Sequence, residues 1–101
     1  MLETLIEAVK GQVRVTCANA GHIGRFAFEP HIIYTDPIVK QTLVAGYYCG
    51  PLDSPANIRR WTEFATKDLT DIRRSQIQFS ADEDSRDHVR QVFGITHLVA
   101  K

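Results

Sequence analysis

A proline inside a strand pattern is the feature that most constrains the fold of this chain. From about residue 23, Phe26 and Phe28 alternate with smaller or charged neighbours, the period-two pattern of a β-strand with one buried face. Pro30 follows and has no N–H to donate to a neighbouring strand, so the strand must bend, bulge or lie at a sheet edge there. An apolar run resumes at residues 32–34. The pattern predicts a β-rich fold whose second strand is interrupted.

Strand patterns continue on both sides of this segment. The segment 40–49 is apolar on both alternations, which is typical of a central strand covered on both faces. Residues 50–57 are rich in Pro, Gly and Ser, and such a loop is a natural place for recognition. The tail 95–101 is either a last strand or a docked arm. Further strands are predicted at 12–18, 58–65 and 71–79.

Two amphipathic helices accompany the strands. Apolar residues at positions 2, 5, 6 and 9 have helical spacing, and Gly11 ends that helix. Ser80 and Glu83 predict a capping box at the start of a second helix. Its apolar stripe at positions 89, 92 and 93 is followed by Gly94, which stops it. The fold class predicted is therefore α+β.

Composition limits the domain number and the partners. The 101 residues are 44% hydrophobic and 24% charged, which fits one compact domain over residues 1–101. Twelve basic and twelve acidic residues cancel, so any anion site must concentrate charge locally. No secretory leader pattern is present, and no apolar run approaches the roughly 20 residues that span a bilayer. We therefore expect a cytoplasmic protein with no membrane partner.

The cysteines and histidines do not have the spacing of a metal site. Cys17 and Cys49 lie in predicted strands, either as two buried thiols or as a disulfide. The chain has four histidines, and they are isolated from one another along the sequence. No nucleophile elbow, phosphate loop or dinucleotide fingerprint occurs. We therefore expect no metal, no cofactor, no catalytic residue and no enzymatic activity.

Two aromatic pairs are candidates for a ligand site. Tyr47 and Tyr48 are adjacent on one predicted strand and point to opposite faces. Trp61 and Phe64 are three apart on the next strand and also point to opposite faces. In one interpretation, one member of each pair belongs to the core and the other is a half-buried residue that covers it. In the other interpretation, Trp61 or Tyr48 lines a ligand cleft and stacks on a planar group.

Two arginine doublets are the local anion candidates. Residues 59–60 and 73–74 are both Arg-Arg, and one arginine of each doublet shares a face with one of the other if their strands pair. Such a pair would clamp a carboxylate or phosphate, whereas the alternative is solvated charge paired with nearby carboxylates. Arg59 shares the face of Trp61, and Arg60 is then the structural or solvated member. The ligand-binding candidates are Arg59, Trp61, Tyr47, Tyr48 and Arg74.

Four motifs in this order resemble the WYL domain, a small Sm-like barrel found in bacterial transcription regulators. They are residues 28–31 (Phe-Glu-Pro-His), 46–47 (Gly-Tyr), 61–64 (Trp-Thr-Glu-Phe) and 69–72 (Leu-Thr-Asp-Ile). The triad that names the family is replaced by Thr-Leu-Val at 42–44, and Glu63 and Ala65 stand where the family has arginines. The resemblance implies a strongly bent antiparallel barrel of about five strands with flanking N- and C-terminal helices.

The resemblance implies a stand-alone, divergent sensing or regulatory interaction module that binds an anionic or nucleotide-like ligand. A protein partner or a second copy of the chain is compatible with that role. The first alternative is a small barrel that binds RNA or single-stranded DNA directly, although the neutral net charge opposes it. The second alternative is a small enzyme built around His31 and Cys49.

Overall fold

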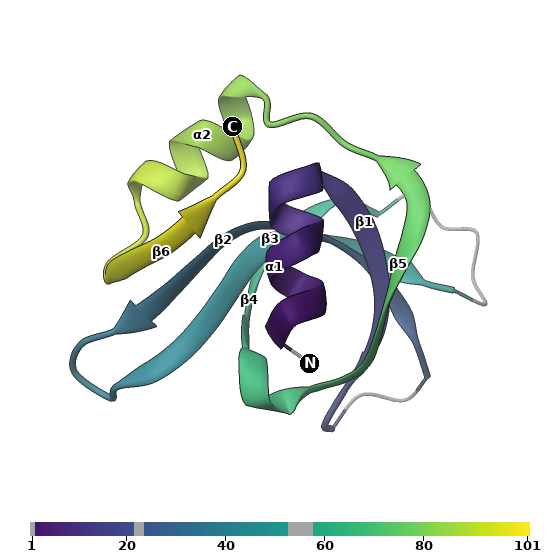
Figure 1. Cartoon of the computed structure of the whole chain (residues 1–101), viewed down its shortest axis with the longest axis horizontal. Coiled ribbons are helices and arrows are strands. Elements are labelled where there is room, and N and C mark those ends of the chain that lie inside the picture. The colour runs from purple at the N-terminus through teal and green to yellow at the C-terminus, as the bar shows by residue number, and fades with distance from the viewer. Residues whose placement is uncertain (1, 22–23, 53–57) are drawn as a thin grey trace.

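Six antiparallel strands and two helices make up the fold, as expected for an α+β domain (Figure 1). The computed structural model describes residues 2–21, 24–52 and 58–101. A short 3-10 turn, η1, connects β4 to β5. In chain order the elements are α1 (Leu2–Gly11), β1 (Val13–Asn19), β2 (Phe26–Asp36), β3 (Gln41–Pro51), β4 (Arg60–Ala65), η1 (Thr66–Asp68), β5 (Leu69–Gln78), α2 (Glu83–Arg90) and β6 (Ile95–Val99).

The strand order is β4-β3-β2-β1-β5, and β6 pairs with β2 outside this path. The expected barrel of about five strands differs from this arrangement, because the sheet has six strands and is not closed. β4 pairs with β3 and β5 pairs with β1, so the two strands lie at opposite ends of the order. Within the described residues no ladder joins β4 to β5. The tail forms β6, which confirms the strand alternative for that segment.

A β-bulge at His31 explains how β2 accommodates its proline. Pro30 is paired with Gly46, but Ile32 is already paired with Ala45, so β2 has one extra residue there. The extra residue reverses the alternation, and Ile32 points to the opposite face of the sheet from Phe28. Of the bend, bulge or edge position predicted from Pro30, the structure has the bulge, and it sets which side chains of β2 reach each face.

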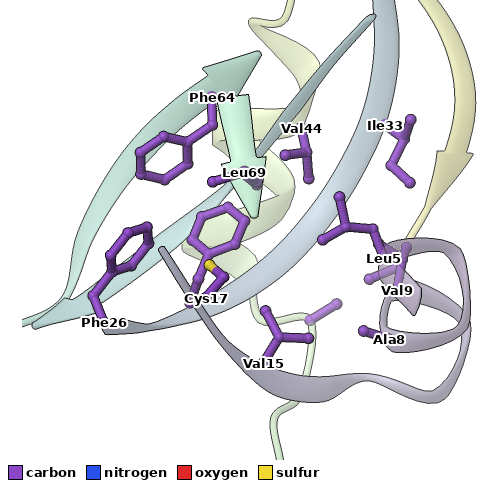
Figure 2. Close-up of a cluster of buried hydrophobic side chains, with 13 residues drawn as sticks. Leu5, Ala8, Val9, Val15, Cys17, Phe26, Ile33, Val44, Phe64 and Leu69 are labelled. Carbon is purple, nitrogen blue, oxygen red and sulfur yellow. The ribbon is translucent and has the colours of Figure 1, made fainter. Parts of the chain in front are cut away.

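One face of the sheet packs against α1 and forms the larger core (Figure 2). The predicted amphipathic helix is confirmed, because Leu5, Ala8 and Val9 are fully buried. α1 contacts β1, β2, β5 and β6. The apolar side chains that meet it across this core include Val15, Cys17, Phe26, Phe28, Ile33, Val44, Phe64 and Leu69.

The second helix begins later than its sequence predicted. Asp82 is the N-cap, and its carboxylate accepts the N–H of Ser85 at 2.8 Å, so the capping box proposed from Ser80 is wrong. The segment just before α2 is bound to the residue between α1 and β1, because the N–H of Ala81 donates to the side-chain oxygen of Gln12 at 3.1 Å. α2 ends at Arg90, before the residues expected to complete its apolar stripe.

Gly94 permits the turn from α2 into β6. A Cβ at this position would lie 2.6 Å from the carbonyl oxygen of Thr35 and 2.7 Å from the ring of Tyr34. Glycine is therefore required by the close approach of β2 rather than as a helix stop. Most of the predicted recognition loop, residues 53–57, lies outside the described residues, as do His22 and Ile23. Neither described helix has the length and apolar character needed to cross a bilayer.

Candidate functional site

The sheet face that packs against α2 has a different composition from the face under α1. Its aromatic cluster consists of His31, Tyr47, Trp61, Phe79 and His88. The rings of Trp61 and His88 are stacked with centroids 4.7 Å apart, and Tyr47 meets Trp61 edge-on at 5.2 Å. Three strands, the segment after β5 and α2 each supply a member, so only the folded chain forms the cluster.

Strand register and helix spacing assemble these rings. Tyr47 on β3 is paired directly with Trp61 on β4, which brings both side chains to the α2 face. On α2, His88 lies three residues after the buried Ser85, so both occupy the helix face turned toward the sheet. Phe64 points to the other face and is 7% exposed in the larger core. The prediction that Trp61 and Phe64 diverge is confirmed.

Arg59 lies on the aromatic cluster just before β4 begins. Its guanidinium carbon is 3.7 Å from the centroid of the Tyr47 ring. It faces two carboxylates, with Nε 3.6 Å from Glu29 and Nη2 3.6 Å from Asp82. Both ion-pair distances exceed that of a hydrogen bond, and the side chain is 44% exposed. The Tyr47 ring therefore positions the guanidinium, while Glu29 and Asp82 pair with its charge only loosely.

Glu29 and His31 are the buried polar residues beneath this arginine. Glu29 is 5% exposed and accepts a hydrogen bond from Arg14 at 2.9 Å. Burial lowers the pKa of His31, so the neutral ring is favoured. Its Nδ1 lies 2.8 Å from the carbonyl oxygen of Glu29, which can only accept, so Nδ1 carries the proton. Nε2 is then a buried acceptor, and it has no partner within the described residues.

Two hollows open on either side of the stacked Trp61 and His88 rings. The arginine hollow, of about 680 Å³, is lined by Tyr47, Arg59, Arg60, Trp61, Asp84, Asp87, His88 and Gln91. The carboxylate hollow, of about 530 Å³, is lined by Tyr34, Asp36, Leu43, Trp61, Glu63, His88, Gln91, Val92 and Phe93. They share Trp61, His88 and Gln91, so one aromatic wall serves two sites of different charge.

No family model, curated protein or solved structure matches this chain. The functional assignment of the two hollows therefore depends on their own geometry and charge.

The structure brings three of the predicted ligand-binding residues together. Tyr47, Arg59 and Trp61 all line the arginine hollow, and Arg59 shares the face of Trp61 as its alternation predicted. The aromatic ring that Arg59 contacts is Tyr47, however, rather than Trp61. Across the hollow lies α2, which the sequence did not associate with this site.

Tyr48 and Arg74 lie away from this site. Tyr48 packs against the larger core, with its ring centroid 5.2 Å from that of Phe26. Arg74 is on β5 and forms an ion pair with Glu7 of α1 at 3.2 Å. The predicted clamp between the two arginine doublets is wrong, because it required β4 and β5 to pair. Arg73 instead pairs with Asp71 at 2.9 Å, the solvated alternative.

Both cysteines have free thiols, so the disulfide alternative is wrong. Cys17 is fully buried in the larger core, and burial raises its pKa to about 12. Cys49 is half-buried, and burial raises its pKa to about 11. Both thiols therefore stay protonated near neutral pH, which makes each a poor nucleophile.

The sequence did not indicate His88 or Gln91 as site residues. His88 had a detectable signal, because it shares the helical spacing of Ser85, Val89 and Val92 and so belongs to the inner face of α2. Gln91 follows the helix and had no such signal. In the part of the chain that the structure describes, no group of three or more potential metal ligands converges.

Proposed function

We propose that this chain is a non-enzymatic ligand-binding module of the WYL type that takes an anionic, nucleotide-like ligand in the arginine hollow. The observation that carries this proposal is Arg59, a half-exposed guanidinium lying on Tyr47 and loosely paired with Glu29 and Asp82. A ligand phosphate or carboxylate would displace these weak pairs and accept two parallel N–H groups. A planar base would lie against the stacked Trp61 and His88 rings, which both line the hollow.

The Sm-like barrel is part of the same proposal. The short turn η1 joins β4 to β5, the two strands at the ends of the sheet order. A curved sheet whose end strands are linked in this way has the topology from which a small barrel closes. Figure 1 shows β1 and β5 curving beside α1, which contacts both strands. A regulatory role through a protein partner or a second copy would follow from the family resemblance.

Local charge favours a small ligand over a long nucleic acid. Asp84 and Asp87 also line the arginine hollow, and Asp87 pairs with Arg90 at 2.6 Å. A polyanion would also extend along Asp84 and Asp87, whereas a single phosphate needs to reach only the guanidinium of Arg59. An enzyme built around His31 and Cys49 is disfavoured, because the protonated thiol of Cys49 is a weak nucleophile.

Calorimetric titration with AMP, ATP and a short oligothymidine at low salt tests the proposal. Arg59→Ala should weaken nucleotide binding about tenfold, the cost of losing a charge-assisted contact. Arg59→Lys keeps the charge without the planar fork, so its affinity should be intermediate. Arg74→Ala is the control, because this arginine lies on β5 and pairs with Glu7. Thermal unfolding of each variant checks that it is folded.

Two results would overturn the assignment. The first is a wild-type protein that binds neither mononucleotide, and the second is an Arg59→Ala variant that binds as tightly as wild type. Binding of the oligothymidine without binding of the mononucleotides would replace the proposal with the nucleic-acid alternative.

A further inference from the structure

The carboxylate hollow combines aromatic walls with two acidic side chains. Tyr34, Trp61 and Phe93 contribute rings, while Asp36 and Glu63 contribute carboxylates. None of the described residues that line it is a lysine or an arginine. The hollow is therefore negative, in contrast to the arginine hollow on the other side of Trp61.

Each carboxylate is held in place through one of its two oxygens. Glu63 accepts a hydrogen bond from the hydroxyl of the buried Tyr34 through Oε2. Asp36 accepts the N–H of Ile38 at 2.8 Å through Oδ1. Within the described part of the chain, the second oxygen of each takes no hydrogen bond. Both side chains thus have an unused acceptor while their positions are fixed, which lowers the entropy cost of binding a cation.

Aromatic faces and carboxylates attract the same class of ligand. A ring face draws a cation by its quadrupole. The stacked His88 ring already covers one face of Trp61, so the exposed ring of Phe93 is the one most open to a cation. Apolar side chains from Leu43 and Val92 complete the lining and suit methyl groups rather than water. Phe93 is 70% exposed, so a ligand in the hollow would cover part of its ring.

We propose that the carboxylate hollow binds a substituted ammonium ion, with Trp61 and Phe93 against its alkyl groups and Asp36 and Glu63 balancing its charge. This inference is independent of the nucleotide proposal, because it depends on different charged residues. Free alkylammonium compounds and methylated lysine side chains share the required chemistry.

Trp61 is the only tryptophan in the chain and lines both hollows, so intrinsic fluorescence reports binding and the variants below assign it to one hollow. The wild-type protein is titrated with choline, with tetramethylammonium and with a short peptide containing trimethyllysine. The neutral isostere 3,3-dimethylbutan-1-ol has the shape of choline without its charge. We expect saturable fluorescence changes with the cations and at least about tenfold weaker binding of the alcohol. Comparing choline with the peptide identifies the source that the hollow prefers.

Conservative variants separate charge from structure. Glu63→Gln can still accept the Tyr34 hydroxyl, and Asp36→Asn can still accept the Ile38 N–H, so both should remain folded. Each should weaken choline binding about tenfold, because one charge is lost. Glu83→Gln is the matched control, since Glu83 is an exposed carboxylate at the start of α2 that lines neither hollow.

The proposal fails if the cations cause no saturable change, if the neutral alcohol binds equally well, or if both amide variants bind like wild type. Arg59→Ala should leave choline binding unchanged. A wild-type protein that binds choline but neither nucleotide, or a nucleotide but not choline, shows which of the two proposals has failed.

Discussion

The two faces of the sheet are built on different physical principles. Under α1 the buried side chains are almost all apolar, from Leu5 through Phe28 to Phe64. Under α2 the buried apolar set is small, and it adjoins the buried polar residues Glu29 and His31. Apolar burial supplies most folding free energy, whereas buried polar atoms without partners cost free energy. The α1 face therefore supplies most of the apolar stabilisation, whereas the α2 face adjoins Glu29 Oε1 and His31 Nε2, which are buried without a hydrogen-bond partner in the described part of the chain.

The largest expected effect is loss of an aromatic ring from the α1 face. Phe28 is fully buried and meets Phe64 edge-on with ring centroids 5.2 Å apart. Phe28→Ala should lower the free energy of unfolding by about 3 to 5 kcal/mol, measured by chemical denaturation. Phe93→Ala, on the exposed α2 side, should cost less than about 0.5 kcal/mol. Similar losses for the two variants would remove the contrast between the faces.

A second test concerns the close approach of β2 and β3 at Gly46, since these two paired strands contribute side chains to both faces of the sheet. A Cβ on Gly46 would overlap the carbonyl oxygen of Glu29, a backbone atom that cannot move independently. Gly46→Ala should therefore cost about 1 to 3 kcal/mol or more in denaturant unfolding. A Cβ on Gly11 would meet Val13 at an ordinary 3.6 Å, so Gly11→Ala is the control and should be neutral or stabilising. Equal effects at the two glycines would contradict the close approach.

Acid should weaken the α2 face first. Because burial lowers the pKa of His31, the unfolded chain binds a proton more readily than the folded one below pH 6.5. Stability from this group is complete above that pH and falls on acidification, by at most about 1.4 kcal/mol per pH unit. Asn can reproduce the Nδ1–H bond to Glu29, so His31→Asn should flatten the dependence between pH 7 and 5.

The exposed His97 provides the control for this titration. His97→Asn makes the same substitution at an exposed ring on β6, so it is the matched control for the buried ring. Urea denaturation at several pH values gives the slope for each variant. An unchanged slope in His31→Asn would contradict the assignment of the acid response to His31.

The smallest expected effect is a difference in labelling rate between the thiols of Cys17 and Cys49. Both should react slowly with a thiol reagent in the folded protein, since burial raises both pKa values. Cys17 is fully buried in the α1 face, whereas Cys49 is half-buried, so Cys49 should be modified first. Mass spectrometry of Cys17→Ser and Cys49→Ser variants measures each rate. Faster labelling of Cys17 would indicate that the α1 face opens more readily than the α2 face.

Local patterns were sufficient to predict most of the elements, though not the bounds of α2. Alternation separated Trp61 from Phe64, and Pro30 indicated the bulge, because both depend on neighbours in sequence. The predicted start of α2 was wrong because Ser80 and Asp82 are both good N-cap residues. The choice between them depends on the hydrogen bond from Ala81 to Gln12, a residue distant in sequence.

The site was harder to predict because it depends on pairing between distant segments. The arginine clamp required β4 and β5 to be neighbours, which no local pattern determines. The ion pairs of Arg59 with Glu29 and Asp82 likewise join three separate parts of the chain. Sequence therefore identified Arg59 and Trp61 as candidates but could not identify α2 as the opposite wall.

The attachment of β6 has a consequence for proteolysis. In the described residues, β6 forms its ladder only with β2, along Ile32–Thr35. Cleavage before Ile95 would release β6 and leave a row of unpaired N–H and C=O groups beside β-branched and aromatic side chains. Such an open edge is a template for intermolecular pairing. A chain trimmed at its C-terminal end should therefore form β-rich aggregates at concentrations where the intact chain remains dispersed.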